Sequence, residues 1–274
     1  MERVKSCVAF GTFEFIHKGH LEVARRTVEL AKEKDMQSVI VSCPNDGDVY
    51  TTEKEKEYLL KQTGIDSFIT YAESTKLEEF FVYLKEELGA QLIVVGENHQ
   101  HLALIQTIAE SINISLELTK VVCIDEKPIT YDWLVQTFEA NDFEMLAELC
   151  NHPYVLIGDV IHGKKLGRTV GMPTTNLHIY KKKKRPNCGV YATKVILEDE
   201  VYKAATNIGT RPTVDDFDYV TIESFILDFD KQIYGEICVL EVYKYLRGIQ
   251  KFADLQQVQN QVKKDIEEIN HLFS

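Results

Sequence analysis

The stretch GDVIHGKKLGRTVGMPTTNL, residues 158–177, follows an apolar run and contains glycines at 158, 163, 167 and 171. Glycines at this density let the backbone turn tightly and present N–H groups to phosphate oxygens. The end of the stretch, Pro173-Thr174-Thr175-Asn176, adds hydroxyl and amide oxygens that suit Mg²⁺ and a nucleotide. On spacing alone, a glycine-rich hairpin of a β-domain explains the stretch equally well.

The sequence around this stretch predicts consecutive β-strands. Runs rich in β-branched and aromatic residues, separated by Gly- or Asp-containing breaks, occupy residues 154–163, 189–197, 202–209, 220–227 and 237–246. Strands without intervening helices favour an antiparallel sheet or a small barrel. Residues 252–273 have the spacing of an amphipathic helix. The second half is therefore predicted to be a β-domain that ends in a helix.

The first half alternates short apolar runs with helical patterns. Strands are predicted at 6–10, 38–43, 67–72, 91–96 and 115–122, and helices at 21–34, 53–64, 77–89 and 103–112. This alternation predicts a parallel, doubly wound sheet, so the fold class is α/β followed by β. After a further predicted helix at 143–150 the pattern changes, which predicts a first domain at 1–150 and a second at 151–274.

Composition excludes several classes of protein. Lys plus Arg number 31 and Asp plus Glu 43, so the net charge is −12 and a nucleic acid partner is not expected. The six cysteines form no C-x-x-C pair, which argues against a zinc cluster or a redox dithiol. No apolar run approaches membrane-spanning length. We expect a cytoplasmic protein without a membrane partner.

The 158–177 stretch resembles the riboflavin kinase motif G-x-V-x-H-G-x-x-L-G-R-x-x-G-x-P-T-x-N. Further pieces of that family follow in the same order, which makes the resemblance specific over about 115 residues. These pieces are GVYA (189–192), NIGTRPT (207–213), IES (222–224), LDF (227–229), IYGE (233–236) and LRGIQKF (246–252).

The resemblance implies a six-stranded antiparallel barrel that transfers the ATP γ-phosphoryl to the 5′-hydroxyl of riboflavin, giving FMN. It implies that Glu223 is the catalytic base and that Thr174 and Asn176 bind Mg²⁺. Strand alternation places Glu223 opposite Ile222 and Ser224, so we expect it in the barrel lumen or at its mouth. Without the resemblance, an exposed strand carboxylate is the commoner role. ATP and Mg²⁺ binding is implied for Gly163, Gly167, Arg168, Gly171, Thr174 and Asn176.

Two segments of the second half carry weaker expectations. The family has a mobile flap near KKKKR (181–185), but a basic run is more often a solvated loop, and we favour that interpretation. Arg247 begins LRGIQKF, where the family pattern is L-R-P-E-x-K-F. Gly248 and Ile249 replace the Pro-Glu pair, so Arg247 is expected either on the flavin side of the site or as a surface arginine.

The first half resembles the FMN adenylyltransferase domain that commonly precedes the kinase barrel in bacteria. AFGTFEFIHKGHLEVARR (9–26) is similar to the motif G-x-F-D-G-x-H-x-G-H, placed between a strand and a helix. The resemblance implies a nucleotide-binding site, active or vestigial, that includes Gly11, Phe13, His17, Gly19 and His20.

This half also departs from the family. Glu14 and Phe15 replace the Asp-Gly pair, VSCPND (41–46) and GENHQHL (96–102) replace two further motifs, and Trp133 and Val135 stand at two arginine positions. Loss of a group that neutralises departing pyrophosphate commonly costs on the order of a hundredfold in rate. We therefore expect a weak or inactive adenylyltransferase.

Three hypotheses of function follow. The first is a riboflavin kinase whose first half serves another purpose, such as homo-oligomer assembly or binding without turnover. The second is a bifunctional enzyme that also converts FMN to FAD, and the third is a non-catalytic flavin-binding regulator. Under the first two, ATP and riboflavin are substrates, Mg²⁺ is the metal and FMN is the product.

Overall fold

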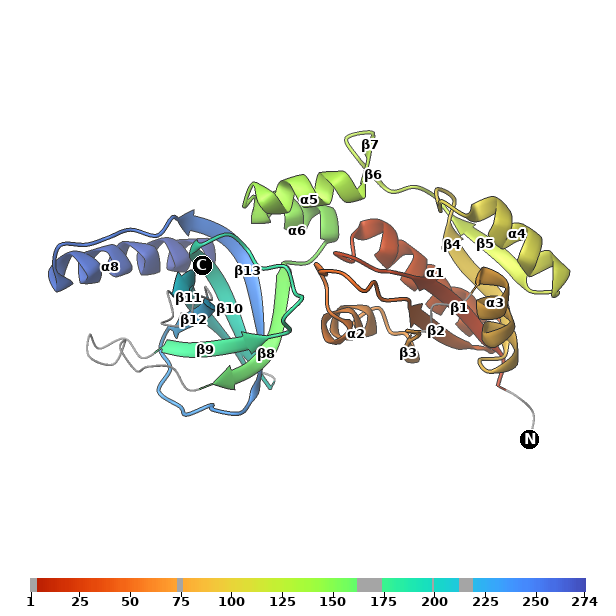
Figure 1. Cartoon of the computed structure of the whole chain (residues 1–274), viewed down its shortest axis with the longest axis horizontal. Coiled ribbons are helices and arrows are strands. Elements are labelled where there is room, and N and C mark those ends of the chain that lie inside the picture. The colour runs from red at the N-terminus through yellow and green to blue at the C-terminus, as the bar shows by residue number, and fades with distance from the viewer. Residues whose placement is uncertain (1–3, 73–75, 162–173, 199, 212–218) are drawn as a thin grey trace. The chain divides into compact units, whose positions relative to one another are not determined.

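The structure is a computed structural model that describes residues 4–72, 76–161, 174–198, 200–211 and 219–274. It contains two compact units, residues 1–131 and 132–274 (Figure 1). The boundary between the units lies before two helices that precede the consecutive strands. The boundary predicted from the sequence, at 150–151, lies after those helices, where consecutive strands begin. It stays a prediction of where the two functional domains separate.

The first unit is built on a parallel sheet with the strand order β3-β2-β1-β4-β5. The order reverses between β1 and β4, the place at which open α/β sheets bind ligands. The doubly wound class predicted from the alternating pattern is therefore confirmed. The strands are β1 (Ser6–Gly11), β2 (Gln37–Ser42), β3 (Ser67–Thr70), β4 (Ala90–Gly96) and β5 (Ser115–Thr119).

Helices alternate with these strands as the periodicity predicts. They are α1 (Lys18–Glu33), α2 (Glu53–Lys61), α3 (Leu77–Glu86) and α4 (Leu102–Ser111), and a hairpin of β6 (Cys123–Ile124) and β7 (Lys127–Pro128) follows β5. The α2 helix begins with a capping box, in which Thr52 accepts from the Glu55 amide and Glu55 accepts from the Thr52 amide.

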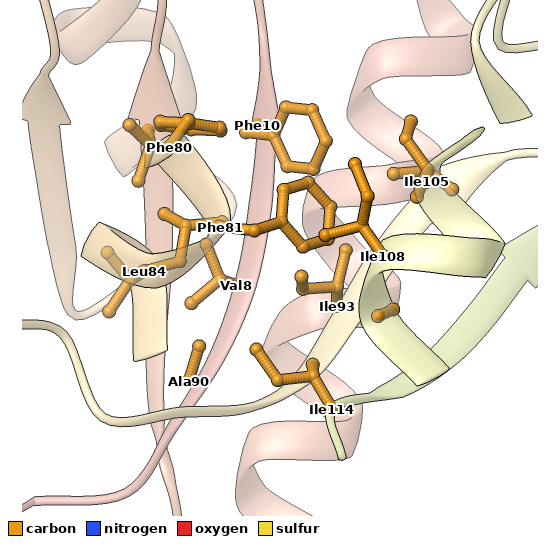
Figure 2. Packing of buried hydrophobic residues seen from close by; sticks show 14 residues of the cluster. Val8, Phe10, Phe80, Phe81, Leu84, Ala90, Ile93, Ile105, Ile108 and Ile114 are labelled. Carbon is orange, nitrogen blue, oxygen red and sulfur yellow. The ribbon is translucent and has the colours of Figure 1, made fainter. Parts of the chain in front are cut away.

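A hydrophobic cluster joins the sheet to α3 and α4 (Figure 2). Phe10 from β1 packs edge-on against Phe80 and Phe81 of α3, with ring centroids 5.2 and 5.6 Å away. Burying a large apolar side chain contributes roughly 1.5–3 kcal/mol. This cluster therefore contributes much of the unit's stability. It also fixes the end of β1, where Phe10 lies. The labelled members are Val8, Phe10, Phe80, Phe81, Leu84, Ala90, Ile93, Ile105, Ile108 and Ile114.

The second unit contains a closed six-stranded barrel with the neighbour order β10-β11-β12-β9-β8-β13. Each of its strand pairs is antiparallel, as the resemblance implies. The terminal helix α8 (Leu255–Leu272) packs on the outside of the barrel (Figure 1). The strands are β8 (Tyr154–Ile161), β9 (Thr174–Ile179), β10 (Gly189–Leu197), β11 (Glu200–Arg211), β12 (Tyr219–Ile226) and β13 (Ile237–Arg247).

Two short helices, α5 (Tyr131–Glu139) and α6 (Phe143–Cys150), precede the barrel. Aromatic rings fasten them to it. Phe138 lies 4.9 Å from Tyr154 of β8, and Phe143 lies 5.6 Å from Tyr191 of β10, centroid to centroid. These contacts explain why both helices belong to the second compact unit.

The basic run 181–185 has the exposed or half-exposed side chains that its composition favours, with the exception of Lys183. Lys183 is only 2% exposed. Its Nζ donates to the carbonyl oxygen of Val155 at 2.9 Å and lies 4.2 Å from the centroid of the Tyr154 ring. A hydrogen bond and a cation–π contact together offset the burial of one charge. Lys181, Lys182 and Arg185 are exposed, as the prediction of a solvated loop requires. The prediction is wrong for Lys183, which is buried.

In the part of the chain that the structure describes, no helix is both long enough and apolar enough to cross a membrane.

Candidate active site

A cavity of about 620 Å³ lies on the outer face of the barrel, beneath α8. Its lining combines polar side chains, among them Glu223 and Asn207, with apolar ones such as Ile249 and Phe252. Described residues that line it are Thr174, Cys188, Val190, Ala205, Asn207, Gly209, Thr210, Thr221, Glu223, Phe225, Arg247, Ile249, Gln250, Phe252, Val262 and Asp265.

The barrel register places the polar residues in one row. Glu223 of β12 is the direct partner of Asn176 in β9 and of Asn207 in β11. Asn207 in turn is opposite Val190 of β10, which is opposite Arg247 of β13. Directly paired residues point to the same face of a sheet. The row therefore crosses five strands on the outer face, with Glu223 near one end and Arg247 at the other.

Glu223 does not face the barrel lumen, which is one of the two positions expected for it; the other, the mouth of the barrel, stays a prediction. Its neighbour Ser224 faces the lumen and bonds through its hydroxyl to Thr206 at 2.8 Å, and Thr206 bonds to Thr193 at 2.7 Å. All three hydroxyl residues are buried. Glu223 is opposite to Ser224, as alternation requires, and it is half-buried in the cavity that α8 covers.

The residues beside Glu223 have the donor chemistry of a magnesium site. Thr174 and Asn176 are two positions apart on β9, so they share a face, and Asn176 pairs with Glu223. A hydroxyl, an amide oxygen and a carboxylate are hard oxygen donors of the kind that Mg²⁺ prefers. Over the described residues there is no cluster of three or more His, Cys, Asp or Glu that could hold a metal. The oxygen donors of Thr174 and Asn176 are of the kind that suits the Mg²⁺ ion that the resemblance implies.

Four of the predicted ATP-binding residues fall outside the described ranges. These are Gly163, Gly167, Arg168 and Gly171.

Arg247 lines the cavity, but its guanidinium is engaged within the protein. Its Nε and Nη2 donate to the carboxylate of Asp265 in α8 at 2.7–3.1 Å, and Nη1 donates to the carbonyl of Gly248 at 3.3 Å. It also lies 5.9 Å from the ring of Phe252. Sequence reasoning missed Asp265, because nothing in a polar helical repeat singles out one acidic residue.

The first unit has its own cleft of about 400 Å³, at the carboxyl ends of β1 and β4. It is lined by all five residues predicted for it, which are Gly11, Phe13, His17, Gly19 and His20. Asn98, His99 and Lys120 also line it, and sequence reasoning did not select them. Asn98 and His99 could have been predicted from the sequence, because they closely follow the apolar run of β4 and ligands bind at the carboxyl ends of such strands.

The H-x-G-H core is organised by the start of α1. His17 is the N-cap, and its Nδ1 accepts from the Gly19 amide at 3.1 Å. A Cβ atom at position 19 would come within 2.8 Å of the His17 ring, which explains the glycine. The His20 ring lies 3.9 Å from that of His17 and 5.2 Å from that of Phe13, centroid to centroid. Burial lowers the pKa of His17 to about 4 and that of His20 well below its ordinary value.

Acid should therefore destabilise the first unit. The folded chain binds fewer protons at His17 than the unfolded chain does, because the folded pKa of about 4 lies below the ordinary 6.5. The contribution to stability is complete above pH 6.5 and is lost as the pH falls towards 4. We expect hydrogen exchange in β1 and α1, corrected for intrinsic rates, to be faster at pH 5 than at pH 7. A His20→Phe variant should lose part of this acid sensitivity, and equal sensitivity would contradict the assignment.

The two substituted residues of the motif are packed into the unit. The Glu14 carboxylate accepts from the amides of Tyr50 and Thr51 at 2.6 and 3.1 Å, and the Phe15 ring stacks on that of Tyr50 at 4.3 Å. Phe15 has a φ of +62°, a left-handed conformation that glycine adopts without strain. Phe13 and Ile16, with φ of +50° and +51°, are left-handed as well. Three non-glycine residues of this turn therefore have a backbone conformation that favours glycine.

The cleft offers little positive charge. Among the described residues that line it, Lys120 is the only one with a full charge at pH 7, because burial keeps His17 and His20 neutral. The pKa of His99 is lowered too, by burial and by the nearby His101. A triphosphate carries several negative charges, so this lining is poorly matched to departing pyrophosphate.

Comparison with known proteins gives one family for each half. A family model described as riboflavin kinase matches residues 150–273, and one described as FAD synthetase matches residues 1–132. The bifunctional riboflavin kinase/FMN adenylyltransferase of Bacillus subtilis is 29% identical, over 100% of this chain and 94% of the relative. A protein of the same name from Haemophilus influenzae is 26% identical, over 97% and 94%.

A solved structure shares the fold. The crystal structure of a protein described as macrolide-efflux protein, from Streptococcus pneumoniae, superposes with a TM-score of 0.82 at 24% identity. The match covers 97% of this chain and 94% of that one.

Proposed function

The chain belongs to the bifunctional riboflavin kinase/FMN adenylyltransferase family, and on that premise we propose that its second unit phosphorylates riboflavin with ATP to form FMN. The observation that carries the proposal is the row of Asn176, Glu223 and Asn207 beside one roomy cavity. A carboxylate next to oxygen donors for a cation is the arrangement that phosphoryl transfer to a hydroxyl needs.

Glu223 acts as the general base. Its carboxylate takes the proton of the riboflavin 5′-hydroxyl while that oxygen bonds to the γ-phosphorus of ATP. The bond from the γ-phosphorus to the bridging oxygen breaks, and ADP leaves with the electron pair. A half-buried carboxylate at the cavity wall can reach a hydroxyl and remain clear of bulk water.

Thr174 and Asn176 would hold the magnesium ion. Bound there, Mg²⁺ supplies charge neutralisation at the transferring phosphoryl group. Asn176 is only 9% exposed, so its amide is held in one position by the barrel rather than by a loop. The glycines and arginine of the motif, at 163, 167, 168 and 171, complete the ATP site in this proposal.

The cavity suits a long ligand. From Glu223 to Arg247 the row crosses three strand spacings, on the order of 14 Å along the sheet. Val190, Ile249 and Phe252 add apolar side chains to the lining. A flavin has a flat aromatic ring at one end and a hydroxylated chain at the other. With its 5′-hydroxyl at Glu223, the ring would lie against apolar side chains of the lining.

The first unit is a weak or inactive adenylyltransferase in this proposal. Trp133 and Val135 stand where the family has arginines, and Lys120 is the single fully charged residue in the described lining of the cleft. The stabilisation of pyrophosphate is thereby reduced. Assembly of a homo-oligomer, a cytoplasmic location and the lack of nucleic acid and membrane partners stay predictions from the sequence.

Full bifunctionality, with FAD as a second product, remains the alternative. It is favoured by the cleft itself, since the H-x-G-H core and the left-handed backbone at Phe15 are retained. A non-catalytic flavin-binding regulator is the third reading, and Glu223 argues against it because binding alone needs no base.

The stoichiometry of products tests the proposed kinase. Purified chain supplied with riboflavin, ATP and Mg²⁺ should form ADP and FMN in equal amounts. ADP without FMN, or the absence of both, would contradict the proposal, and pyrophosphate formation would point to the adenylyltransferase.

A further inference from the structure

One buried ion pair joins the end of β13 to α8 at the wall of the cavity. Arg247 Nε donates to both carboxylate oxygens of Asp265 at 3.0 and 3.1 Å, and Nη2 donates to one of them at 2.7 Å. The side chains are 16% and 5% exposed. Gln261, one turn earlier, also donates to Asp265 at 2.9 Å. Such a forked arginine–carboxylate pair fixes direction as well as distance.

This pair lies between the later half of α8, which is packed on the barrel, and the earlier half, which is packed weakly. The later half of α8 is held by apolar contacts, in which Ile266, Ile269 and Phe273 pack on the barrel. The earlier half, residues 255–264, has no fully buried residue. Val262 belongs to that earlier half, yet it lines the cavity. Asp265 is thus the last firm attachment before the part of α8 that forms the cavity wall.

The pair also decides the charge at this end of the cavity. All three guanidinium nitrogens of Arg247 have partners inside the protein, two on Asp265 and one on the Gly248 carbonyl. The positive charge of Arg247 is cancelled by Asp265 next to it. The cavity wall therefore has no net charge from this pair, which matches an uncharged aromatic ring better than a phosphate.

We propose that Asp265 is a positioning residue of the flavin site, which acts through Arg247 to hold the earlier half of α8 as the wall against which the ring binds. The proposal rests on the proposed kinase function. It gives Arg247 a role different from direct contact with a flavin phosphate. It also predicts that loss of the pair weakens riboflavin binding and has little effect on ATP binding, because the proposed ATP ligands Thr174 and Asn176 lie on β9, which does not pair with β13.

The test is an Asp265→Asn variant of the full chain. Asn keeps the shape of the side chain but removes the charge and one acceptor, so the fork is lost. We expect the Kd for riboflavin, measured by quenching of its fluorescence, and the KM for riboflavin to rise about tenfold. The kcat at saturating riboflavin and the KM for ATP should stay within about twofold, since the reacting groups are unchanged.

A second ion pair between the same two elements provides the control. Lys244 of β13 and Glu268 of α8 are 3.3 Å apart but 35% and 47% exposed, and neither lines the cavity. Glu268→Gln should leave riboflavin binding unchanged. Equal effects of Asp265→Asn and Glu268→Gln, or an equal loss of riboflavin and ATP binding, would overturn the proposal.

An Arg247→Lys variant covers the case in which Asp265→Asn does not fold. Lysine keeps the charge beside Asp265 but lacks the planar fork of the guanidinium. The ion pair with Asp265 is therefore retained, but its fixed orientation is lost. Weaker riboflavin binding with unchanged ATP binding is again expected, and unchanged riboflavin binding would overturn the proposal. If the unmodified chain neither binds nor phosphorylates riboflavin, the proposed function fails instead, whatever the variants do.

Discussion

Replacing Glu223 with Gln is expected to lower kcat for FMN formation by about 10²–10⁴-fold, the usual contribution of a general base. Gln has the same shape but cannot accept the proton of the 5′-hydroxyl. Because the apolar side chains of the cavity lining are unchanged in this variant, riboflavin should still bind. We expect its Kd, from fluorescence quenching, to change by less than about threefold.

The matched control for this variant is Glu241→Gln. Glu241 is a half-buried carboxylate on β13 that accepts from the Tyr243 hydroxyl at 2.7 Å, and it does not line the cavity. Its replacement should leave kcat unchanged. If Glu223→Gln loses riboflavin binding and catalysis in equal measure, Glu223 is a binding residue and its assignment as the base is wrong.

Replacing Asn176 with Leu should raise the Mg²⁺ concentration needed for half-maximal activity by about 10–100-fold. Leu fills a similar volume but removes the amide oxygen assigned to the ion, and changes at groups that orient or hold a metal typically have effects of this size. The measurement is a titration of FMN formation with Mg²⁺ at saturating riboflavin. A fall in activity without any change in the Mg²⁺ dependence would remove Asn176 from the metal site.

Thr175 on the same strand supplies the control. Its hydroxyl donates to the Ser224 carbonyl at 3.3 Å, on the face opposite to Asn176. Thr175→Val should lower the free energy of unfolding by about 1 kcal/mol through the lost hydrogen bond. It should leave the Mg²⁺ titration unchanged, because no cavity group is altered.

The fold was predictable wherever local periodicity decided the structure. The parallel strands of the first unit and their helices follow from alternating apolar runs, whose pattern survives because both sheet faces are covered. Among the elements that periodicity did not predict are β9 and α5. The β9 strand has the sequence TTNLHI, in which polar residues face the cavity, and α5 begins inside a segment that looked like a degenerate phosphate motif. In neither element does burial decide the residue pattern. The pattern of β9 suits the proposed site, and that of α5 follows the loss of the phosphate motif.

The roles of the site residues stay predictions, and only their placement can be compared with the structure. Alternation correctly separates Glu223 from Ser224, yet it does not say which face of the sheet is the lumen. The lumen holds the hydroxyls of Thr193, Thr206 and Ser224, and no local pattern marks these three residues as the inner ones. Only closure of the barrel and the packing of α8 decide it. The Arg247–Asp265 contact spans elements whose meeting is fixed by tertiary packing, so no local pattern could predict it.

In the first unit, a substitution in the motif does not prevent a left-handed backbone at the substituted position. Phe15 replaces the glycine of the family motif, and its backbone is left-handed, a conformation that favours glycine. Stacking of Phe15 on Tyr50 and the two amide bonds to Glu14 offset the strain. What the cleft lacks is positive charge rather than shape. This is why we expect it to bind more readily than it catalyses.

The central claim is that this chain makes FMN and makes FAD weakly or not at all. The direct measurement is to incubate the purified full chain with riboflavin, ATP and Mg²⁺ and to follow both products by chromatography. We predict that FMN accumulates while FAD forms on the order of a hundredfold more slowly or is absent. FAD formation at a rate comparable to that of FMN would contradict the claim, and would mean that other residues replace the two missing arginines.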